Sequence, residues 1–347
     1  MLAAVYYGPN DLRIEERPVP EIGPGEALLK VLSTGICGTD LRIWHGSHRK
    51  YTPGTIRIPG HEVVGDIVNL GTEVSGIETG QRVFIAPNMG CGHCRQCISG
   101  NNNLCANYSA PGITIDGSFA EYMHIPSAAI LQGNLIPISK EIDPAAAALI
   151  EPFACVLRGQ EALHIQPGES VLVVGAGPIG MMHVMLAQLR GSGVVIVSEL
   201  ITERAAQARE FGADLVVNPN EQDLAAVIDE LTNGMGVDVV IVAAPAPRAQ
   251  EMAVELAAIG GRINLFGGLP KDHPTIQLNS NLVHYKELVI TGTTACSTQD
   301  CHRAAVIVNS GQIDLSRLIG VRFPLGEAIQ ALSVTESGKA LKVVLEP

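Results

Sequence analysis

Apolar runs alternate with amphipathic segments in the second half of the chain, between residues 153 and 293. The runs are rich in valine and isoleucine and end at glycine or polar residues, as buried strands do; they lie at 170–175, 194–199, 214–218, 237–244 and 261–268. The segments between them place apolar residues at helical spacing and lie at 178–191, 202–212, 224–234 and 248–260. This alternation predicts right-handed crossovers and a parallel sheet with helices on both faces.

The first 152 residues follow a different pattern. Their short extended runs are bounded by glycine or proline, which predicts a β-rich domain with long loops; these runs lie at 27–35, 62–71, 81–87 and 119–126. After residue 293 the alternation lapses, and the remaining residues resemble a helix, a turn and two strands. We therefore expect one domain over 1–152, a second over 153–293, and a tail, 294–347, that returns to the first domain.

Composition narrows the class of protein. The 347 residues correspond to about two domains, and a hydrophobic fraction of 46% supplies sizeable cores, which excludes a disordered chain. The 23 Lys and Arg against 35 Asp and Glu give a formal net charge of −12, and an acidic surface repels phosphate backbones and anionic lipid. No apolar run approaches the ~20 residues that span a bilayer, and the opening residues lack a secretory pattern. We expect a cytoplasmic protein that binds neither nucleic acid nor membranes.

A glycine motif follows the strand expected at 170–175. Gly175, Gly177 and Gly180, with Pro178 and Ile179 before the last glycine, fit G-x-G-x-x-G where a strand ends and a helix begins. The first glycine permits a tight turn, the second lets a pyrophosphate approach the backbone, and the third allows close helix–strand packing, while the helix N-terminus offers N–H groups to the phosphates. This context predicts a dinucleotide-binding Rossmann domain; the alternative is a glycine cluster that only packs a helix.

An acidic residue, Glu199, ends the next expected strand. A carboxylate at this position accepts hydrogen bonds from both ribose hydroxyls and repels a 2′-phosphate, which favours NAD over NADP. Arg204 follows about one helical turn later and is a candidate to cover the adenosine. The alternative is a glutamate that is only solvated.

Four of the eight cysteines are crowded into one short stretch with the spacing C-x2-C-x2-C-x7-C: Cys91, Cys94, Cys97 and Cys105. Four thiolates on one loop suit tetrahedral Zn²⁺, and a closed four-thiolate site is structural because it leaves no position for a substrate. A disulfide framework would instead spread pairs through a small secreted chain. The rival interpretation is an iron–sulfur cluster.

Further motifs complete a family pattern. They are, in order, GICGTD at 35–40, Gly60-His61-Glu62-x-x-Gly65-x5-Gly71-x-x-Val74, the four-cysteine lobe, GSFAEY at 117–122, EPFACV at 151–156 and GAGPIG at 175–180. Over essentially its whole length the sequence resembles the zinc-dependent medium-chain alcohol dehydrogenase family, of the medium-chain dehydrogenase/reductase superfamily, within its sorbitol (polyol) and threonine dehydrogenase branch. The resemblance implies an α/β fold, with a Rossmann doubly wound parallel sheet and a β-rich GroES-like catalytic domain that carries the four-cysteine lobe.

The resemblance also implies a catalytic zinc site. Cys37, His61 and Glu151 occupy the family's ligand positions, with Glu62 as an adjacent or alternating ligand. A carboxylate at Glu151, where other alcohol dehydrogenases place a cysteine, points to the polyol branch. The family's proton relay begins two residues after the first ligand, at Thr39 here, whose alternative role is a helix N-cap.

The activity implied is that of an oxidoreductase with two zinc ions, one catalytic and one structural. Zinc lowers the pKa of a substrate hydroxyl, and a hydride passes to NAD. The main expectation is a secondary alcohol of a polyol or sugar-derived substrate, with or without a phosphate; the alternatives are L-threonine and 2,3-butanediol. A homodimer or homotetramer is implied. The presence of every ligand disfavours a catalytically silent structural protein of this fold and a zinc-free quinone reductase.

The chain departs from the family at several positions near the site. Arg42 stands where alcohol and threonine dehydrogenases often carry histidine. Sorbitol dehydrogenases place an aromatic residue at Ile43 and a Phe-Arg pair at Thr294-Ala295. We expect Asp40 to brace the site loop, because carboxylates beside zinc ligands usually orient their neighbours.

A basic run lies shortly after Cys37 in this acidic chain and consists of His45, His48, Arg49 and Lys50. We hypothesise that it lies at the mouth of the active-site cleft and attracts a phosphate or carboxylate of the substrate. The alternative is a solvated loop.

Overall fold

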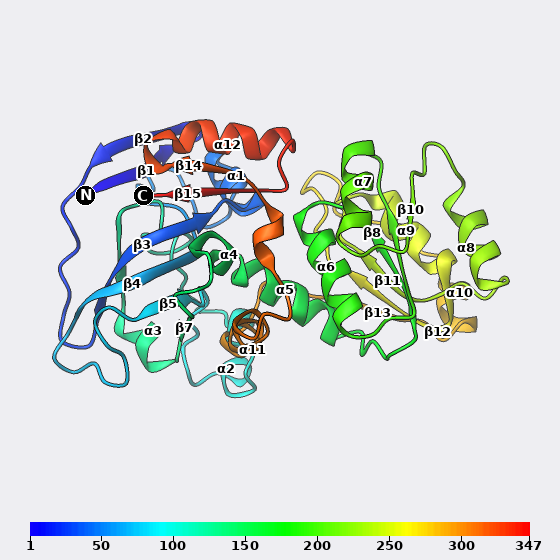
Figure 1. Ribbon diagram of the computed structural model, residues 1–347, viewed down its shortest axis with the longest axis horizontal. Coiled ribbons are helices and arrows are strands. Elements are labelled where there is room, and N and C mark those ends of the chain that lie inside the picture. Colours follow the sequence, from blue (N-terminus) through cyan, green and yellow to red (C-terminus); the bar gives the residue numbers. More distant parts are fainter. The chain divides into compact units, whose positions relative to one another are not determined.

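The computed structural model describes all 347 residues, which form two compact units (Figure 1). One unit consists of residues 1–154 and 295–347, and the other of residues 155–294. The sequence predicts divisions after residues 152 and 293. The first division between the units falls inside a helix, α5 (Ile150–Glu161).

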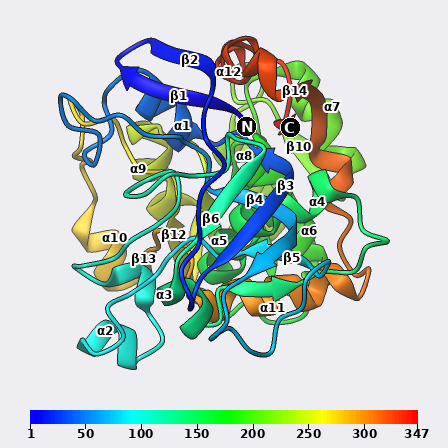
Figure 2. The same ribbon diagram turned by 90° about the vertical axis from the view of Figure 1, so that its left-hand side faces the viewer.

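The first unit is built on a seven-stranded sheet with the order β14-β15-β3-β4-β5-β7, in which β6 also pairs with β3 (Figure 2). Its strands are β3 (Ala27–Gly35), β4 (Glu62–Leu70), β5 (Arg82–Ile85), β6 (Tyr122–Ile125), β7 (Leu135–Pro137), β14 (Ile319–Pro324) and β15 (Lys342–Glu346). Its α-helices are α1 (Gly38–Trp44), α2 (Arg95–Ile98), α3 (Ser127–Leu131), α4 (Pro144–Ala148), α11 (Thr298–Asn309) and α12 (Ala328–Ser337). Short 3-10 turns lie at Asn102–Leu104, Leu315–Leu318 and Leu325–Glu327.

A two-stranded antiparallel sheet at the N-terminus was not among the predicted elements. It consists of β1 (Leu2–Gly8) and β2 (Asp11–Glu16), joined by a tight turn in which Asn10 has a φ of 60°. Four consecutive residues of β1 are buried, from Ala3 to Tyr6. The strand therefore lacks the apolar–polar alternation that marks a strand with one solvated face.

The core of the main sheet is formed by aliphatic side chains on the antiparallel strands β3, β4, β5 and β6. Leu29, Val31, Ile67 and Val83 are almost completely buried in it. Because β3 and β4 pair along their whole length, the end of β3 at Gly35 lies beside the start of β4 at Glu62. This pairing positions the residues just after β3 and just before β4 next to each other.

The C-terminal segment joins the first unit. β15 pairs in parallel with β14 and antiparallel with the end of β3, where Val344 lies opposite Gly35. The tail contains a second helix, α12, besides the predicted helix and two strands. Helix α12 ends at Ser337, and the φ of 65° at the following Gly338 is the left-handed conformation common after a helix C-terminus.

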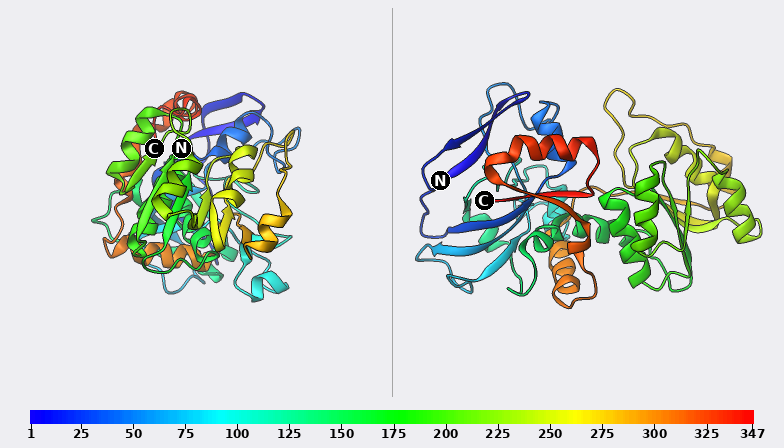
Figure 3. Two further views of the ribbon diagram at one scale, coloured as in Figure 1. Left: turned by 90° about the vertical axis from the view of Figure 1, so that its right-hand side faces the viewer. Right: turned by 45° about the horizontal axis from the view of Figure 1, so that its top comes forward.

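The second unit is a doubly wound parallel sheet with the order β10-β9-β8-β11-β12-β13. Its strands are β8 (Ser170–Val174), β9 (Val194–Ser198), β10 (Leu215–Val217), β11 (Val237–Val242), β12 (Ala257–Leu265) and β13 (Val289–Gly292). Its helices are α6 (Pro178–Leu189), α7 (Thr202–Glu210), α8 (Leu224–Thr232), α9 (Pro247–Leu256) and α10 (Ser280–Tyr285). Helices α6 and α7 lie on one face of the sheet, and α8 and α9 lie on the other (Figure 3). The strand order reverses between β8 and β11, which creates a topological switch point at the carboxyl ends of these strands.

One boundary in this unit differs from the prediction. The helical pattern expected over 248–260 ends at Leu256, and β12 begins at Ala257. Ala257 pairs with Val237 of β11 and is completely buried. Alanine occurs in helices and in strands, so the residue type does not fix the conformation at this point. Pairing with β11, which is distant along the chain, makes Ala257 part of a strand.

No helix of the chain is both long enough and apolar enough to cross a membrane.

Candidate metal centres and nucleotide site

The four clustered cysteines meet in one compact group. Their sulfur atoms all lie within 4.8 Å of one another; the Cys91–Cys97, Cys94–Cys97 and Cys94–Cys105 sulfur distances are 4.0, 3.5 and 3.8 Å. A tetrahedral ion with metal–sulfur bonds of about 2.3 Å separates its thiolates by roughly 3.8 Å. The cysteines therefore fit one Zn²⁺ ion without rearrangement.

The backbone of the lobe favours this arrangement. A Cβ at Gly90 would lie 2.4 Å from the sulfur of Cys97, so no larger residue fits there. Backbone N–H groups of His93 and Cys94 lower the pKa of Cys91 to about 6, which favours the thiolate that a metal binds. Burial raises the pKa of Cys97 to about 11, so that thiol needs a bound cation to ionise near neutral pH.

A second group of ligand atoms forms where β3 leads into α1 and where β4 begins. Cys37 is the N-cap of α1, and His61 and Glu62 stand at the start of β4. Their ligand atoms lie within 4.8 Å of one another, and His61 and Glu62 are 7% and 0% exposed. Cys37, His61 and Glu62 can supply a thiolate, an imidazole and a carboxylate, a set of donors that suits Zn²⁺.

Asp40 braces this group. Its Oδ2 accepts a hydrogen bond of 2.8 Å from the backbone N–H of Cys37, and its Oδ1 lies 3.7 Å from Nδ1 of His61. The side chain is 1% exposed. Burial lowers the pKa of His61, but the Asp40 carboxylate and the Cys37 thiol outweigh it and raise the pKa well above its usual value.

Glu151, the third ligand expected from the resemblance, is placed differently. It lies in the first turn of α5, is 6% exposed, and is not part of the compact Cys37–His61–Glu62 group. One of its carboxylate oxygens lies 3.7 Å from the sulfur of Cys296. The structure thus groups Glu62 with Cys37 and His61, and it places Glu151 next to Cys296.

Lys342, which the sequence analysis did not select, also belongs to this region. It is the first residue of β15 and is 6% exposed, and its Nζ lies 2.6 Å from the Glu62 carboxylate. The two residues are 280 positions apart along the chain. The only local signal is a lysine followed by three apolar residues, and lysines at such positions are usually solvated.

Thr39, the expected start of the proton relay, lies on α1 next to the ligand group. The guanidinium of Arg42 donates a hydrogen bond of 3.0 Å to its Oγ1. The N-cap of this helix is Cys37 rather than Thr39.

The basic run separates into two parts. His45 lies 2.7 Å from a carboxylate oxygen of Glu336 on α12, and so it serves a contact within the fold. His48 is half-buried, and burial together with the charges of Arg42, Arg49 and His61 lowers its pKa to about 4. Arg42, Arg49 and His61 therefore lie within electrostatic reach of His48.

The second unit contains a cavity of about 590 Å³ at the carboxyl ends of its strands. All seven residues expected to bind the dinucleotide line it: Gly175, Gly177, Pro178, Ile179, Gly180, Glu199 and Arg204. The cavity lies at the N-terminus of α6, beside the switch point between β8 and β11. This is where open α/β sheets bind nucleotides.

Steric limits require glycine at the first and the last position of the motif. Gly175 has a φ of 98°, which a residue with a Cβ rarely adopts, and a Cβ at Gly180 would lie 1.8 Å from the carbonyl oxygen of Gly175. Gly177 is the N-cap of α6, and a Cβ there would meet nothing within 4 Å. The turn therefore keeps its N–H groups accessible at the helix N-terminus, where a pyrophosphate would bind.

Glu199 is held in place by backbone groups. Its Oε2 accepts a hydrogen bond of 2.6 Å from the N–H of Ala176, and its Oε1 accepts one of 2.9 Å from the N–H of Ile201. Each carboxylate oxygen can accept a further hydrogen bond. The residues present therefore fit a dinucleotide with free ribose hydroxyls.

Two protein-family models match this chain. Residues 23–137 match the model of the alcohol dehydrogenase GroES-like domain, and residues 178–310 match that of zinc-binding dehydrogenases. The chain belongs to the zinc-dependent medium-chain alcohol dehydrogenase family, so the predicted family and fold class are confirmed. It is a zinc-dependent oxidoreductase that uses a nicotinamide dinucleotide.

Its relatives include dehydrogenases that are named for different substrates. The L-threonine 3-dehydrogenase of Pyrococcus horikoshii is 36% identical over 97% of this chain and 95% of that protein. The sorbitol dehydrogenase of Halalkalibacterium halodurans is 31% identical over 100% of this chain and 98% of that protein. A solved structure described as a zinc-binding dehydrogenase from Sinorhizobium meliloti, with NADP bound, is 32% identical, covers 100% of this chain and 99% of its own, and has a TM-score of 0.91.

Proposed function

We propose that this enzyme oxidises the secondary hydroxyl of a small substrate that also carries a carboxylate, with L-threonine as the first candidate and NAD as the hydride acceptor. The observation that carries the proposal is the near full-length relationship to L-threonine 3-dehydrogenase at 36% identity. The proposal adopts the alternative drawn from the sequence in place of a polyol substrate.

The residues of the first unit divide the chemistry between them. Cys37 and His61, completed by a carboxylate from Glu62 or Glu151, would hold the catalytic zinc. When bound, this ion supplies Lewis-acid polarisation that lowers the pKa of the substrate hydroxyl. The four-cysteine lobe would hold the second, structural zinc.

Thr39 is positioned to move the hydroxyl proton. Its Oγ1 already accepts one hydrogen bond from Arg42, and a hydroxyl has a second lone pair and one hydrogen to offer. The guanidinium of Arg42 stays protonated in proteins, so the proton cannot pass to residue 42. Arg42 would instead orient Thr39 and hold a positive charge next to it.

A carboxylate on the substrate agrees with the cationic side chains around His48, in the segment that follows Cys37. Arg42 and Arg49 act electrostatically on half-buried His48, which also interacts with His61. A neutral diol or hexitol would gain little from these cations, whereas an amino-acid carboxylate would be attracted by them.

Glu199 supports NAD over NADP. Its carboxylate is 7% exposed and is fixed by two backbone N–H groups at the edge of the nucleotide cavity. A 2′-phosphate beside this fixed negative charge would be repelled, while two ribose hydroxyls could donate to it.

Initial rates of cofactor reduction test both parts of the proposal. We expect the highest kcat/KM with L-threonine and NAD, compared with 2,3-butanediol, sorbitol and sorbitol phosphate and with NADP. Highest kcat/KM with sorbitol would restore the polyol interpretation, and preference for NADP would refute the role given to Glu199.

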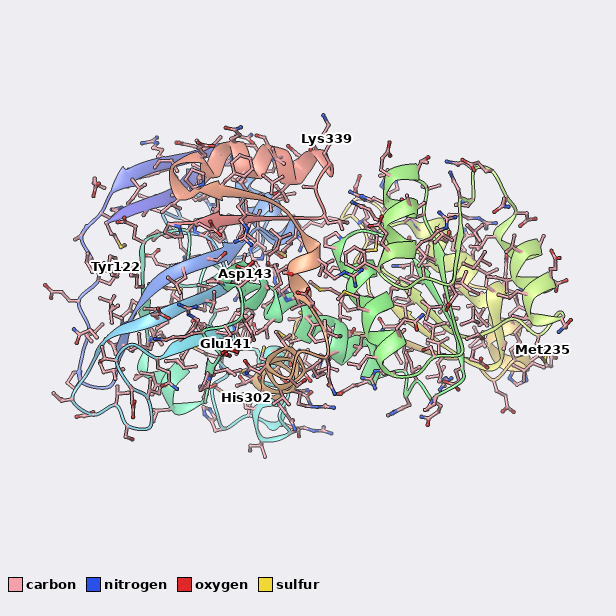
Figure 4. The ribbon with its side chains drawn as sticks, viewed as in Figure 1. Tyr122, Glu141, Asp143, Met235, His302 and Lys339 are labelled. Atoms are coloured by element: carbon pink, nitrogen blue, oxygen red, sulfur yellow. The ribbon has the colours of Figure 1, made fainter.

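One variant and its control test whether the enzyme contacts a carboxylate of its substrate. Arg49→Ala should raise the KM for L-threonine about fivefold, the effect of losing an exposed ion pair of about 1 kcal/mol, and leave the KM for 2,3-butanediol unchanged. Lys339→Ala is the matched control, because this exposed lysine lies in the turn after α12 (Figure 4). Equal KM changes for both substrates would contradict the proposed carboxylate contact.

A further inference from the structure

An asparagine of the four-cysteine lobe is hydrogen-bonded to the start of helix α11. Asn102 lies between Cys97 and Cys105, and the backbone N–H of Cys105 donates to its carbonyl over 3.1 Å. Its side-chain amide makes two hydrogen bonds to Thr298, the first residue of α11. Oδ1 accepts 3.0 Å from the backbone N–H of Thr298, and Nδ2 donates 2.8 Å to its Oγ1. The lobe and the helix are therefore joined through both polar atoms of one amide.

A second asparagine, Asn88, lies between β5 and the lobe and contacts the residue before the N-cap of α11. Its Nδ2 donates a hydrogen bond of 2.9 Å to the carbonyl oxygen of Cys296. Its own carbonyl accepts 2.6 Å from Nδ2 of Asn102 and 2.9 Å from Nδ2 of Asn134. The three asparagines are 7%, 9% and 0% exposed, in chain order. Because a buried amide is costly to leave unpaired, these contacts fix the backbone of residues 296–298.

The residue that precedes this segment has a strained backbone. Ala295 has a φ of 52°, in the left-handed region that residues with a Cβ rarely adopt. Such a conformation persists where the surrounding structure holds it in place. The hydrogen bond from Asn88 to Cys296 and the capping box of Ser297 and Asp300 fix the residues that follow Ala295. The asparagines therefore help to maintain this strained conformation.

The side chain of Cys296 lies against Glu151. Its thiol donates a weak hydrogen bond of 3.7 Å to Oε1 of Glu151, and the two residues are 0% and 6% exposed. Glu151 is outside the compact group of ligand atoms at the proposed catalytic zinc site, but it and Cys37 both act electrostatically on Lys342. A displacement of Cys296 therefore changes the surroundings of an acidic side chain near that site.

We propose that Asn88 and Asn102 are positioning residues, which fix the segment before α11 to the four-cysteine lobe and thereby hold the Cys296 thiol on the carboxylate of Glu151 in the arrangement that turnover requires. Neither asparagine belongs to a group of ligand atoms. The lobe then contributes to the reaction through these amides as well as to the stability of the fold. The proposal rests on the zinc site of the proposed function and is independent of which alcohol is oxidised.

Infrared absorption of the thiols tests the contact without turnover. The S–H stretching band shifts with the strength of the hydrogen bond that a thiol donates, and the band that disappears on adding Cys296→Ala identifies Cys296 in each protein. We expect Asn88→Ala and Asn102→Ala to move this band towards the position of a thiol without a hydrogen bond. Asn101→Ala is the matched control and should keep the wild-type band, because Asn101 donates to the carbonyl of Ser99 within the lobe.

Variants outside the lobe keep the proposal testable if Asn102→Ala does not fold or loses zinc. Thr298→Val removes the hydroxyl that accepts from Asn102 and should shift the band in the same direction, whereas Thr298→Ser keeps the hydroxyl and should keep the wild-type band. Adding Ala295→Gly to Asn88→Ala should return the band towards its wild-type position, because glycine adopts a positive φ without the steric cost.

Steady-state rates with the best alcohol substrate connect the band to the reaction. In Asn88→Ala and Asn102→Ala we expect kcat to fall by about tenfold, since small displacements near a reacting centre slow the reaction. The KM for the dinucleotide should stay unchanged, because neither asparagine lines the nucleotide cavity. A wild-type band in both folded, zinc-loaded variants would overturn the proposal, and so would a shifted band with wild-type kcat. If another alcohol than L-threonine is preferred, the substrate proposal fails while these comparisons between variants stand.

Discussion

A buried histidine on the nucleotide-binding helix makes the stability of the second unit depend on pH. His183 lies on α6, is 0% exposed, and packs edge-on against Phe266 with ring centroids 4.7 Å apart. Nε2 of Gln160 donates 2.8 Å to the backbone carbonyl of His183, and the ring has no ionic partner in its surroundings that would stabilise a charge. Burial accordingly lowers the pKa of His183 to about 3.

The magnitude follows from linkage between protonation and folding. An unfolded chain has a histidine pKa of about 6.5, whereas the folded value is about 3. Between these two values the unfolded state binds the extra proton, so the stability contributed by the neutral ring is present above pH ~6.5 and falls as the pH decreases. pH 5 lies about 1.5 units below the unfolded pKa, so the free energy of unfolding at pH 5 is about 2 kcal/mol lower than at pH 8.

Urea unfolding of wild type and His183→Gln, each at pH 8 and pH 5, tests this value. From pH 8 to pH 5 the free energy of unfolding of the wild type should fall by about 2 kcal/mol more than that of the variant. Protonation of the zinc ligands affects both proteins equally and cancels in the difference. An equal loss in both proteins would refute the argument, because the neutral buried ring would then contribute no pH dependence.

Three further outcomes follow from the two metal centres and the nucleotide cavity. Cys97→Ser should lower the zinc content from about two ions per chain to about one, measured by elemental analysis; unchanged zinc would contradict a four-thiolate site. Gly180→Ala should weaken NAD binding at least tenfold in titrations, with zinc retained, because its Cβ would lie 1.8 Å from the carbonyl oxygen of Gly175. Glu199→Ala should narrow the ratio of kcat/KM between NAD and NADP, since the fixed carboxylate that repels a 2′-phosphate is lost; an unchanged ratio would assign discrimination to other residues.

Much of the nucleotide domain could be predicted because its signals are local. Strand β8, the glycine turn and α6 follow one another within 170–189, and each step has its own steric or hydrogen-bonding cause. The same holds for the four-cysteine lobe, where one loop supplies every ligand. The end of α9 was misplaced for the opposite reason, since a distant strand decides the backbone at Ala257.

Motifs and local patterns were sufficient to assign the family, the alternation of strands and helices in the second unit, and the residues that can hold zinc or a dinucleotide. Which of the catalytic candidates lie together depends on strand pairing in the folded chain. Pairing of β3 with β4 brings Cys37 to His61 and Glu62, while β15 adds Lys342 from 280 residues beyond Glu62. Backbone hydrogen bonds between strands are nearly the same whichever strands pair, so the chain's local pattern carries little information about these partners. The choice of pairing comes from burial summed over the whole sheet, which exists only once the chain has folded.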